Sequence, residues 1–155
     1  ALLTNCINYD NHSFIEKIVE DLPKDLVLIS PDGGALKKIY KVAKCLKSYE
    51  VIEASKSRDV KTGKLSGFQV YADDLEGRNC LIVDDICDGG GTFLGLAQEL
   101  KKKNAGNLYL AISHGIFNKG FESLEEFYTK IYVTNSFRVI EGEKLVEQIK
   151  ISELI

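Results

Sequence analysis

Residues 81–92 read Leu-Ile-Val-Asp-Asp-Ile-Cys-Asp-Gly-Gly-Gly-Thr, an apolar run followed by acids and three glycines. The apolar run predicts a buried strand over 80–84, and the amphipathic pattern after the glycines predicts a helix over 93–104. Because glycines lack a Cβ, their backbone N–H groups can converge on one anion, and a helix N-terminus adds partial positive charge. The stretch therefore predicts a phosphate cradle beside carboxylates that suit sugar hydroxyls or Mg²⁺. The alternative interpretation is a tight turn with two solvated acids.

Strand and helix patterns alternate along the rest of the chain. Helices are expected over 11–21, 36–46 and 121–128, strands over 26–30, 49–54, 68–71, 108–112 and 131–134, and a last amphipathic stretch over 143–149. This alternation, with near-continuous apolar strands, predicts an α/β fold in which helices cover both faces of a parallel central sheet. The polar, glycine-containing segment 55–67 predicts a flexible loop or β-ribbon arm.

Composition excludes several classes of protein. The 155 residues fit one domain, 1–155, and a net charge of −3 argues against a nucleic-acid partner. No apolar run approaches the ~20 residues that cross a bilayer, so no membrane partner is expected. The four cysteines, Cys6, Cys45, Cys80 and Cys87, form no Cys-x-x-Cys pair, and we expect inert, reduced thiols in a cytoplasmic protein.

Residues 83–92 resemble the phosphoribosyl diphosphate (PRPP) motif of type I phosphoribosyltransferase-fold proteins. Further segments resemble, in order, the carboxyl-terminal half of the ribose-phosphate diphosphokinase (PRPP synthetase) family: Ile29–Gly34, Lys56–Arg58, Ser113–Phe117 and Val133–Asn135. The resemblance covers roughly residues 26–137. It implies a phosphoribosyltransferase-like fold and the ribose-5-phosphate half of an enzyme, with no counterpart here of the family's ATP-binding amino-terminal half.

The resemblance also implies roles for individual residues. Lys56 and Arg58 would be the catalytic cations on the arm, and Asp32 would contact Mg²⁺. The ribose 5-phosphate site would comprise Arg58, Asp84, Asp85, Asp88, Gly89, Gly90, Gly91 and Thr92.

Several of these residues also have a purely structural interpretation. Asp85 either assists Asp84 or faces the opposite side of its strand, since neighbouring strand residues alternate. Asp32 is explained equally by a Pro-Asp-Gly turn. Lys56 and Arg58 either converge on one anion, as strand residues two apart do, or belong to a solvated basic loop. His114 also follows a strand, and we expect it to pack or hydrogen-bond rather than act in catalysis.

Three positions depart from the family pattern. Gly33-Gly34-Ala35 stands where the family has Ala-Gly-Gly, and Ser57 stands between the two cations where the family has Arg. Gly89 replaces the usual Thr and so removes one hydroxyl from the phosphate loop.

The activity that the resemblance implies is transfer of diphosphate from ATP to C1 of ribose 5-phosphate, giving PRPP and AMP, with Mg²⁺ as cofactor. Much of the ATP would be bound through the absent domain or a neighbouring subunit, since the family forms homo-oligomers. We therefore expect the isolated chain to be inactive or nearly so. Two alternatives stay open: a phosphoribosyltransferase that consumes PRPP, and a non-catalytic regulatory homologue that binds a phosphorylated sugar.

Overall fold

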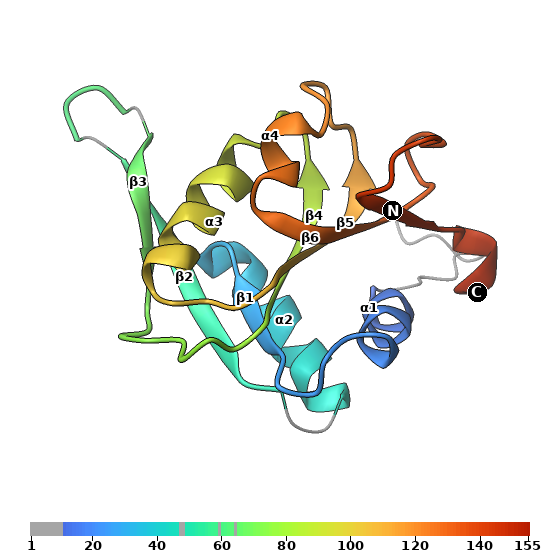
Figure 1. Cartoon of the computed structure of the whole chain (residues 1–155), viewed down its shortest axis with the longest axis horizontal. Coiled ribbons are helices and arrows are strands. Elements are labelled where there is room, and N and C mark those ends of the chain that lie inside the picture. Colours follow the sequence, from blue (N-terminus) through green and yellow to red (C-terminus); the bar gives the residue numbers. More distant parts are fainter. Residues whose placement is uncertain (1–10, 47–48, 59, 64) are drawn as a thin grey trace, which may run out of the picture.

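The computed structural model describes residues 11–46, 49–58, 60–63 and 65–155. The elements along the chain (Figure 1) are α1 (His12–Glu20), β1 (Val27–Ser30), α2 (Gly33–Cys45), β2 (Val51–Arg58), β3 (Leu65–Val70), β4 (Cys80–Cys87), α3 (Gly91–Lys102), β5 (Leu108–Gly115), α4 (Glu122–Glu125), β6 (Tyr128–Thr134), β7 (Val146–Ile149) and the 3₁₀ turn η1 (Ile151–Glu153). In the described parts, no helix is long and apolar enough to cross a membrane.

Within the described residues, seven strands form one sheet in the order β3-β2-β1-β4-β5-β6-β7. Every neighbouring pair is parallel except β2 and β3, which form an antiparallel ribbon. The ribbon projects from the body of the molecule (Figure 1) and contains much of the segment expected as an arm. The α/β fold with a central, mostly parallel sheet is confirmed, while flexibility of the arm stays a prediction.

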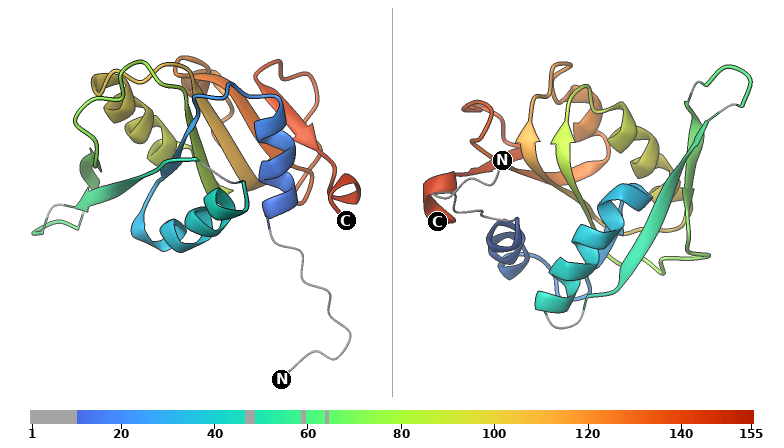
Figure 2. Two further views of the ribbon diagram at one scale, coloured as in Figure 1. Left: turned by 90° about the horizontal axis from the view of Figure 1, so that it is seen from below. Right: turned by 180° about the vertical axis from the view of Figure 1, so that it is seen from behind.

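Helices cover both faces of the sheet (Figure 2). Two sets of apolar side chains, one on each face, make the core. Leu28 and Leu81 face α1 and α2, whereas their neighbours Ile29 and Ile82 face α3 and α4. Strand side chains alternate between the two faces, and both faces are covered, so the buried parts of the central strands are almost entirely apolar. This explains why the sequence shows continuous apolar runs rather than alternation. Ser30 and Thr134, the last residues of β1 and β6, are the buried polar exceptions among the described residues.

Three elements differ from the expected bounds. β4 continues past the acids to Cys87, because Ile86 and Cys87 still pair with β5. The helix expected over 121–128 is only the short α4, since Tyr128 already belongs to β6. The last amphipathic stretch holds the edge strand β7, which pairs with β6.

Candidate functional site

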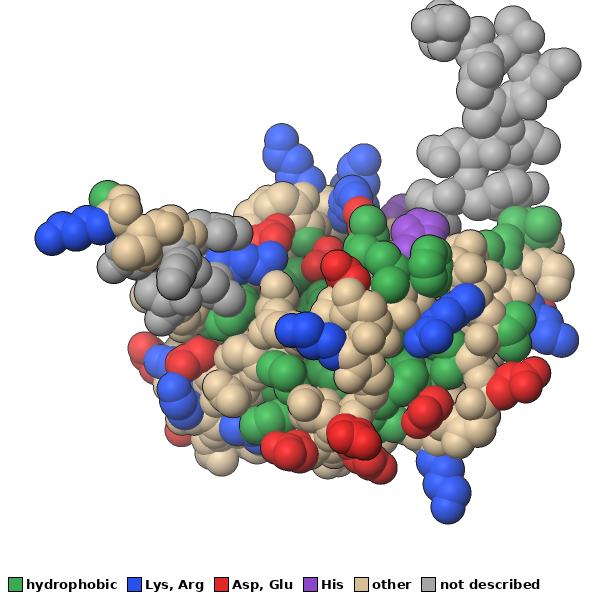
Figure 3. Space-filling view, turned by 90° about the horizontal axis from the view of Figure 1, so that it is seen from above, with side chains coloured by type: hydrophobic (Ala, Val, Ile, Leu, Met, Phe, Trp, Pro, Cys, Tyr) green, Lys and Arg blue, Asp and Glu red, His purple; other side chains and the backbone are tan. Residues whose placement is uncertain are grey.

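The carboxyl ends of β1, β4, β5 and β6 lie along one edge of the sheet, which is the upper edge in Figure 1. In open α/β sheets this edge is where ligands bind. Figure 3 looks onto this edge and shows acidic and basic side chains gathered beside one another near its centre.

The glycine loop after β4 borders a hollow of about 220 Å³. Gly90 has φ 78°, a left-handed conformation that glycine adopts without strain, and it is the residue before α3. The hollow is lined by Lys56, Asp84, Ile86, Asp88, Gly89, Gly90, Gly91, Thr92 and Phe93. The structure thus brings together most of the residues expected for the sugar phosphate.

Asp84 is the partly buried acid of this hollow. Burial raises the pKa of its carboxyl, and repulsion from Asp32 and Asp85 adds to that rise. The Asp85 N–H donates to Asp84 Oδ1 at 2.8 Å, which works in the opposite direction, as does the charge of Lys56. The result is an oriented oxygen acceptor, suited to hydrogen bonds from sugar hydroxyls.

Asp85 has a different partner. Its carboxylate forms an ion pair with Lys38 of α2, and this hydrogen bond raises the pKa of Lys38. Asp85 is not among the residues that line the hollow. Of the two orientations that the sequence allowed, the structure shows the one facing α2.

Asp32 begins α2 and also meets the arm. Its Oδ1 accepts hydrogen bonds from the N–H groups of Gly34 and Ala35 at 3.0 and 3.1 Å, and its Oδ2 accepts one from Lys56 Nζ at 3.3 Å. Burial by itself would raise the pKa of Asp32, but the Ala35 N–H and Lys56 outweigh it and hold the pKa below its usual value. The helix cap alone explains an Asp here, so its contact with Mg²⁺ stays a prediction.

The side chains at this edge can hold Mg²⁺ only together with ligands from a substrate. No group of three or more His, Cys, Asp or Glu side chains that could hold a metal is found in the parts of the chain described. Mg²⁺ is commonly held by one or two carboxylates plus substrate phosphates, and Asp32 and Asp84 lie close enough to affect one another's charge. The residues therefore fit a Mg²⁺ ion that arrives with phosphate ligands.

Of the two cations expected on the arm, the structure describes the side chain of Lys56 but not that of Arg58. Lys56 lies in β2 opposite Phe68 of β3, and its side chain lines the hollow. The pairing of β2 with β3 shifts register between Ser57 and Arg58. The side chain of Arg58 lies outside the described part of the structure, so its role stays a prediction.

Asp88 is tied to the loop that follows β5. Its Oδ1 accepts a hydrogen bond from Asn118 Nδ2 at 2.7 Å, and its backbone oxygen accepts one from the Asn118 N–H at 3.0 Å. Sequence reasoning missed Asn118, as it missed Lys38. The expectation that loops after neighbouring parallel strands share one edge was the available signal for Asn118.

His114 lies apart from the cradle. Its Nδ1 is 2.6 Å from Ser136 Oγ, and both residues border a second hollow of about 170 Å³. His114 is thus a hydrogen-bonding residue, as expected. Cys80 and Cys87 are buried free thiols, and burial raises their pKa values to about 11 and about 12, so they stay protonated at neutral pH. Cys6 lies outside the described residues.

Residues 7–148 match the family model of the phosphoribosyl transferase domain. The chain belongs to this family. This phosphoribosyltransferase domain is 35% identical over 129 residues to a ribose-phosphate pyrophosphokinase of Mycoplasmopsis pulmonis, a match that covers 82% of this chain and 40% of that protein. It is 32% identical to the ribose-phosphate pyrophosphokinase of Mycoplasma genitalium, with 92% of this chain and 44% of that protein covered. The domain thus spans less than half the length of these relatives.

Solved structures agree with this placement of the phosphoribosyltransferase domain. A phosphoribosylpyrophosphate synthetase from Mycobacterium smegmatis superposes with a TM-score of 0.75 at 25% identity, covering 92% of this chain and 46% of that one. An APRTase from Giardia lamblia gives a TM-score of 0.58 at 19% identity, covering 84% of this chain and 78% of that one, which shows the fold alone. The family that the sequence motifs indicated is confirmed.

Proposed function

We propose that the chain is the ribose-5-phosphate domain of a ribose-phosphate diphosphokinase, which transfers diphosphate from ATP to C1 of ribose 5-phosphate to give PRPP and AMP. The observation that supports this most is the single hollow bordered by Asp84, the glycine loop and Lys56. An anion cradle next to a carboxylate suits a ligand that carries both a phosphate and vicinal hydroxyls.

Each residue of the hollow then has a role in binding or in transfer that its chemistry allows. The amides of Gly89–Gly91 and the N-terminus of α3 bind the 5-phosphate, while Asp84 accepts hydrogen bonds from the ribose hydroxyls. The C1 oxygen attacks the β-phosphorus of ATP and loses its proton to water. The bond between the β-phosphorus and the oxygen that bridges to the α-phosphate breaks, and AMP leaves with that oxygen. Charge on the transferred phosphates grows during this step, and Lys56 is placed to oppose it, together with Arg58.

Mg²⁺ belongs to this proposal as the cofactor. When bound, it would neutralise charge on the phosphates of the nucleotide. Asp32 is the residue that we assign to it, together with substrate oxygens. Lys56, which holds Asp32 Oδ2 in this structure, would then be released toward the phosphates.

ATP needs further binding groups. The hollow of about 220 Å³ is smaller than the ~300–1,000 Å³ of sites for drug-sized ligands, so it suits the sugar phosphate without the nucleotide. We assign the adenosine part to another domain or to a neighbouring subunit of a homo-oligomer. The relatives, more than twice the length of the matched region, leave room for such a domain.

The proposal is tested by calorimetric titration of the chain with ribose 5-phosphate. Binding is expected for the wild type and a loss of about tenfold or more for Asp84→Asn, because the amide cannot accept the same charge-assisted hydrogen bonds. Asp73→Asn is the matched control, since Asp73 is exposed and lies between β3 and β4, at the opposite edge of the sheet.

Other outcomes would change the assignment. Absence of ribose 5-phosphate binding by the wild type would refute the proposal. Consumption of PRPP with a nucleobase would instead identify a phosphoribosyltransferase, and equal binding by Asp84→Asn would favour a homologue that holds the sugar in another way.

A further inference from the structure

Gly89 leaves a space in the phosphate loop that a neighbouring loop fills. A Cβ on Gly89 would lie 3.3 Å from Asn118 Oδ1 and 3.4 Å from Lys119 Cε. The side chain that the family usually has at this position would therefore meet the residues that follow β5. The glycine and the Asn118–Lys119 pair form one local arrangement, in which Lys119 packs over the loop.

The loop that carries Lys119 is held in place by its own contacts. The N–H groups of Ile116 and Phe117 donate to the Cys87 oxygen at 2.9 and 3.2 Å. Phe117 has φ 48°, and its ring is 3% exposed and lies 4.7 Å from that of Phe121, with the two rings tilted by 42°. A Cβ on Gly115 would lie 2.3 Å from the Phe117 ring, so the missing side chain there makes room for it. Lys119 is thus presented from a fixed turn.

Charge at the hollow points to a need for one more cation. Asp84 and Asp88 line it, and a sugar phosphate brings further negative charge. The ammonium of Lys38 is paired with Asp85, and that of Lys56 contacts Asp32 and is assigned above to the transferred phosphates rather than to the 5-phosphate. Lys119 forms no ion pair with any residue in the described part of the chain.

We propose that Lys119 binds the phosphate that is held by the glycine loop. Its positive charge compensates for the hydroxyl that the loop lacks because residue 89 is glycine. The inference rests on the proposed function and adds a ligand-contacting residue from outside the PRPP motif. Lys119 does not line the hollow in this structure, but its Cε would lie only 3.4 Å from a Cβ on Gly89, so the flexible side chain can turn its ammonium toward a phosphate bound by this loop. Asn118 is the positioning residue, because its side-chain amide donates to Asp88 and so ties the glycine loop to the loop that carries Lys119.

The test is titration with ribose 5-phosphate and, separately, with inorganic phosphate, on the wild type and on Lys119→Gln. We expect affinity for both ligands to fall about tenfold, the usual worth of a charge-assisted phosphate contact. Lys119→Arg keeps the affinity within about threefold, and the salt dependence of binding is weaker for Lys119→Gln, since one charge no longer takes part.

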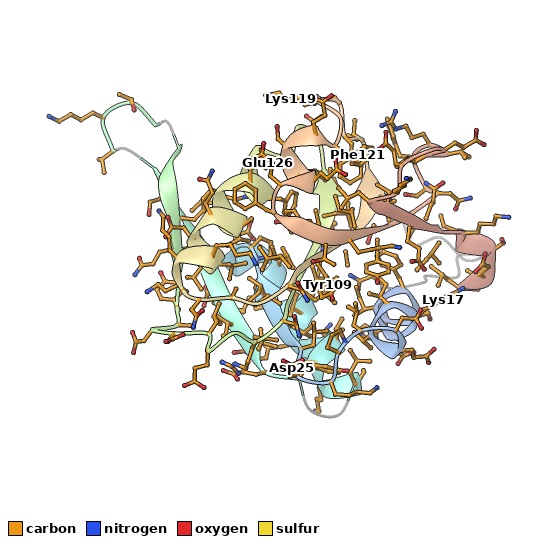
Figure 4. All side chains as sticks on the ribbon, in the orientation of Figure 1. Lys17, Asp25, Tyr109, Lys119, Phe121 and Glu126 are labelled. Carbon is orange, nitrogen blue, oxygen red and sulfur yellow. The ribbon has the colours of Figure 1, made fainter. Side chains whose placement is uncertain are left out.

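Lys24→Gln is the matched control, because Lys24 precedes β1 and lies at the opposite end of the sheet. Figure 4 shows this separation: Lys119 stands at the upper edge beside Phe121, whereas Asp25, the neighbour of Lys24, stands at the lower edge. Equal affinities of wild type and Lys119→Gln would overturn the inference and leave the proposed function intact. A wild type that binds neither ligand would refute the proposed function itself. Equal thermal unfolding of the variants shows that folding is unaffected.

Discussion

At the scale of single residues, the partly buried charge of Asp84 lowers the stability of the fold and at the same time suits the binding of a ligand. Burial raises the pKa of its carboxyl, so the folded protein holds the charged form less well than the unfolded chain does. The cost to stability is fully present above the folded pKa and disappears as the pH falls through the unfolded value. A carboxylate retained at such a cost is expected where its charge serves a ligand.

Asp84→Asn is therefore expected to stabilise the protein at pH 7 while weakening ribose 5-phosphate binding. The free energy of unfolding rises by about 0.5 kcal/mol, because the partly buried charge is gone. The gain shrinks as the pH falls through the raised pKa of the wild-type carboxyl, where that carboxyl itself takes up a proton. Urea denaturation of both proteins at several pH values measures this, and a variant that is less stable than the wild type at pH 7 would contradict it.

Sequence reasoning found the residues of the site that sit inside a motif and missed those that do not. Asp84 and the three glycines follow one apolar strand, so their place at its end was predictable. Lys38 meets Asp85 across 47 positions, and Asn118 meets Asp88 across 30. Such contacts depend on how strands and helices pack, which no local pattern of residues records.

At the scale of elements, the contact between α3 and the ribbon positions Lys56. Phe68 of β3 stands opposite Lys56 of β2, and its ring packs over Gly95 of α3. A Cβ on Gly95 would lie 2.3 Å from Phe68 Cε2, so the helix and the ribbon approach this closely only because residue 95 has no side chain.

Gly95→Ala is expected to push the ribbon outward. The free energy of unfolding falls by about 1–3 kcal/mol, the usual cost of overpacking, despite the better helix propensity of Ala. Gly91→Ala is the control for stability, since a Cβ on Gly91 meets nothing within 4 Å. Chemical denaturation compares the two, and equal stability of Gly95→Ala and Gly91→Ala would show that the ribbon does not depend on this contact.

Helices and strands were predictable from the sequence where a local pattern of apolar and polar residues defines them. Apolar strands and amphipathic helices were expected close to where they lie, because burial on a sheet covered on both sides dictates their composition. The elements after β5 were harder to predict. A helix expected over 121–128 is cut short by β6, since the pairing of Tyr128 with Leu108 outweighs the helical pattern.

At the scale of the whole molecule, the mostly parallel sheet explains why residues from distant parts of the sequence form one site. Different strands carry these residues: Asp32 and Lys119 follow β1 and β5, while Lys56 and Asp84 lie in the last halves of β2 and β4. All come to one edge because those strands are parallel. The order of the strands could not be read from the chain, because many orders satisfy the same alternation of strands and helices. The structure supplies that order.

The same arrangement limits what this domain can do alone. Under the proposed function its hollow binds the sugar phosphate alone, and diphosphoryl transfer needs ATP held in line with the C1 oxygen. We expect the isolated chain to bind ribose 5-phosphate and yet form AMP from ATP at a rate at least about 100-fold below that of a full-length relative assayed in parallel, because positioning of the nucleotide is lost. A coupled assay of AMP formation measures this, with the Asp84→Asn chain as the blank. A rate equal to that of the full-length relative would mean that this domain, or an assembly of its copies, builds the nucleotide site by itself.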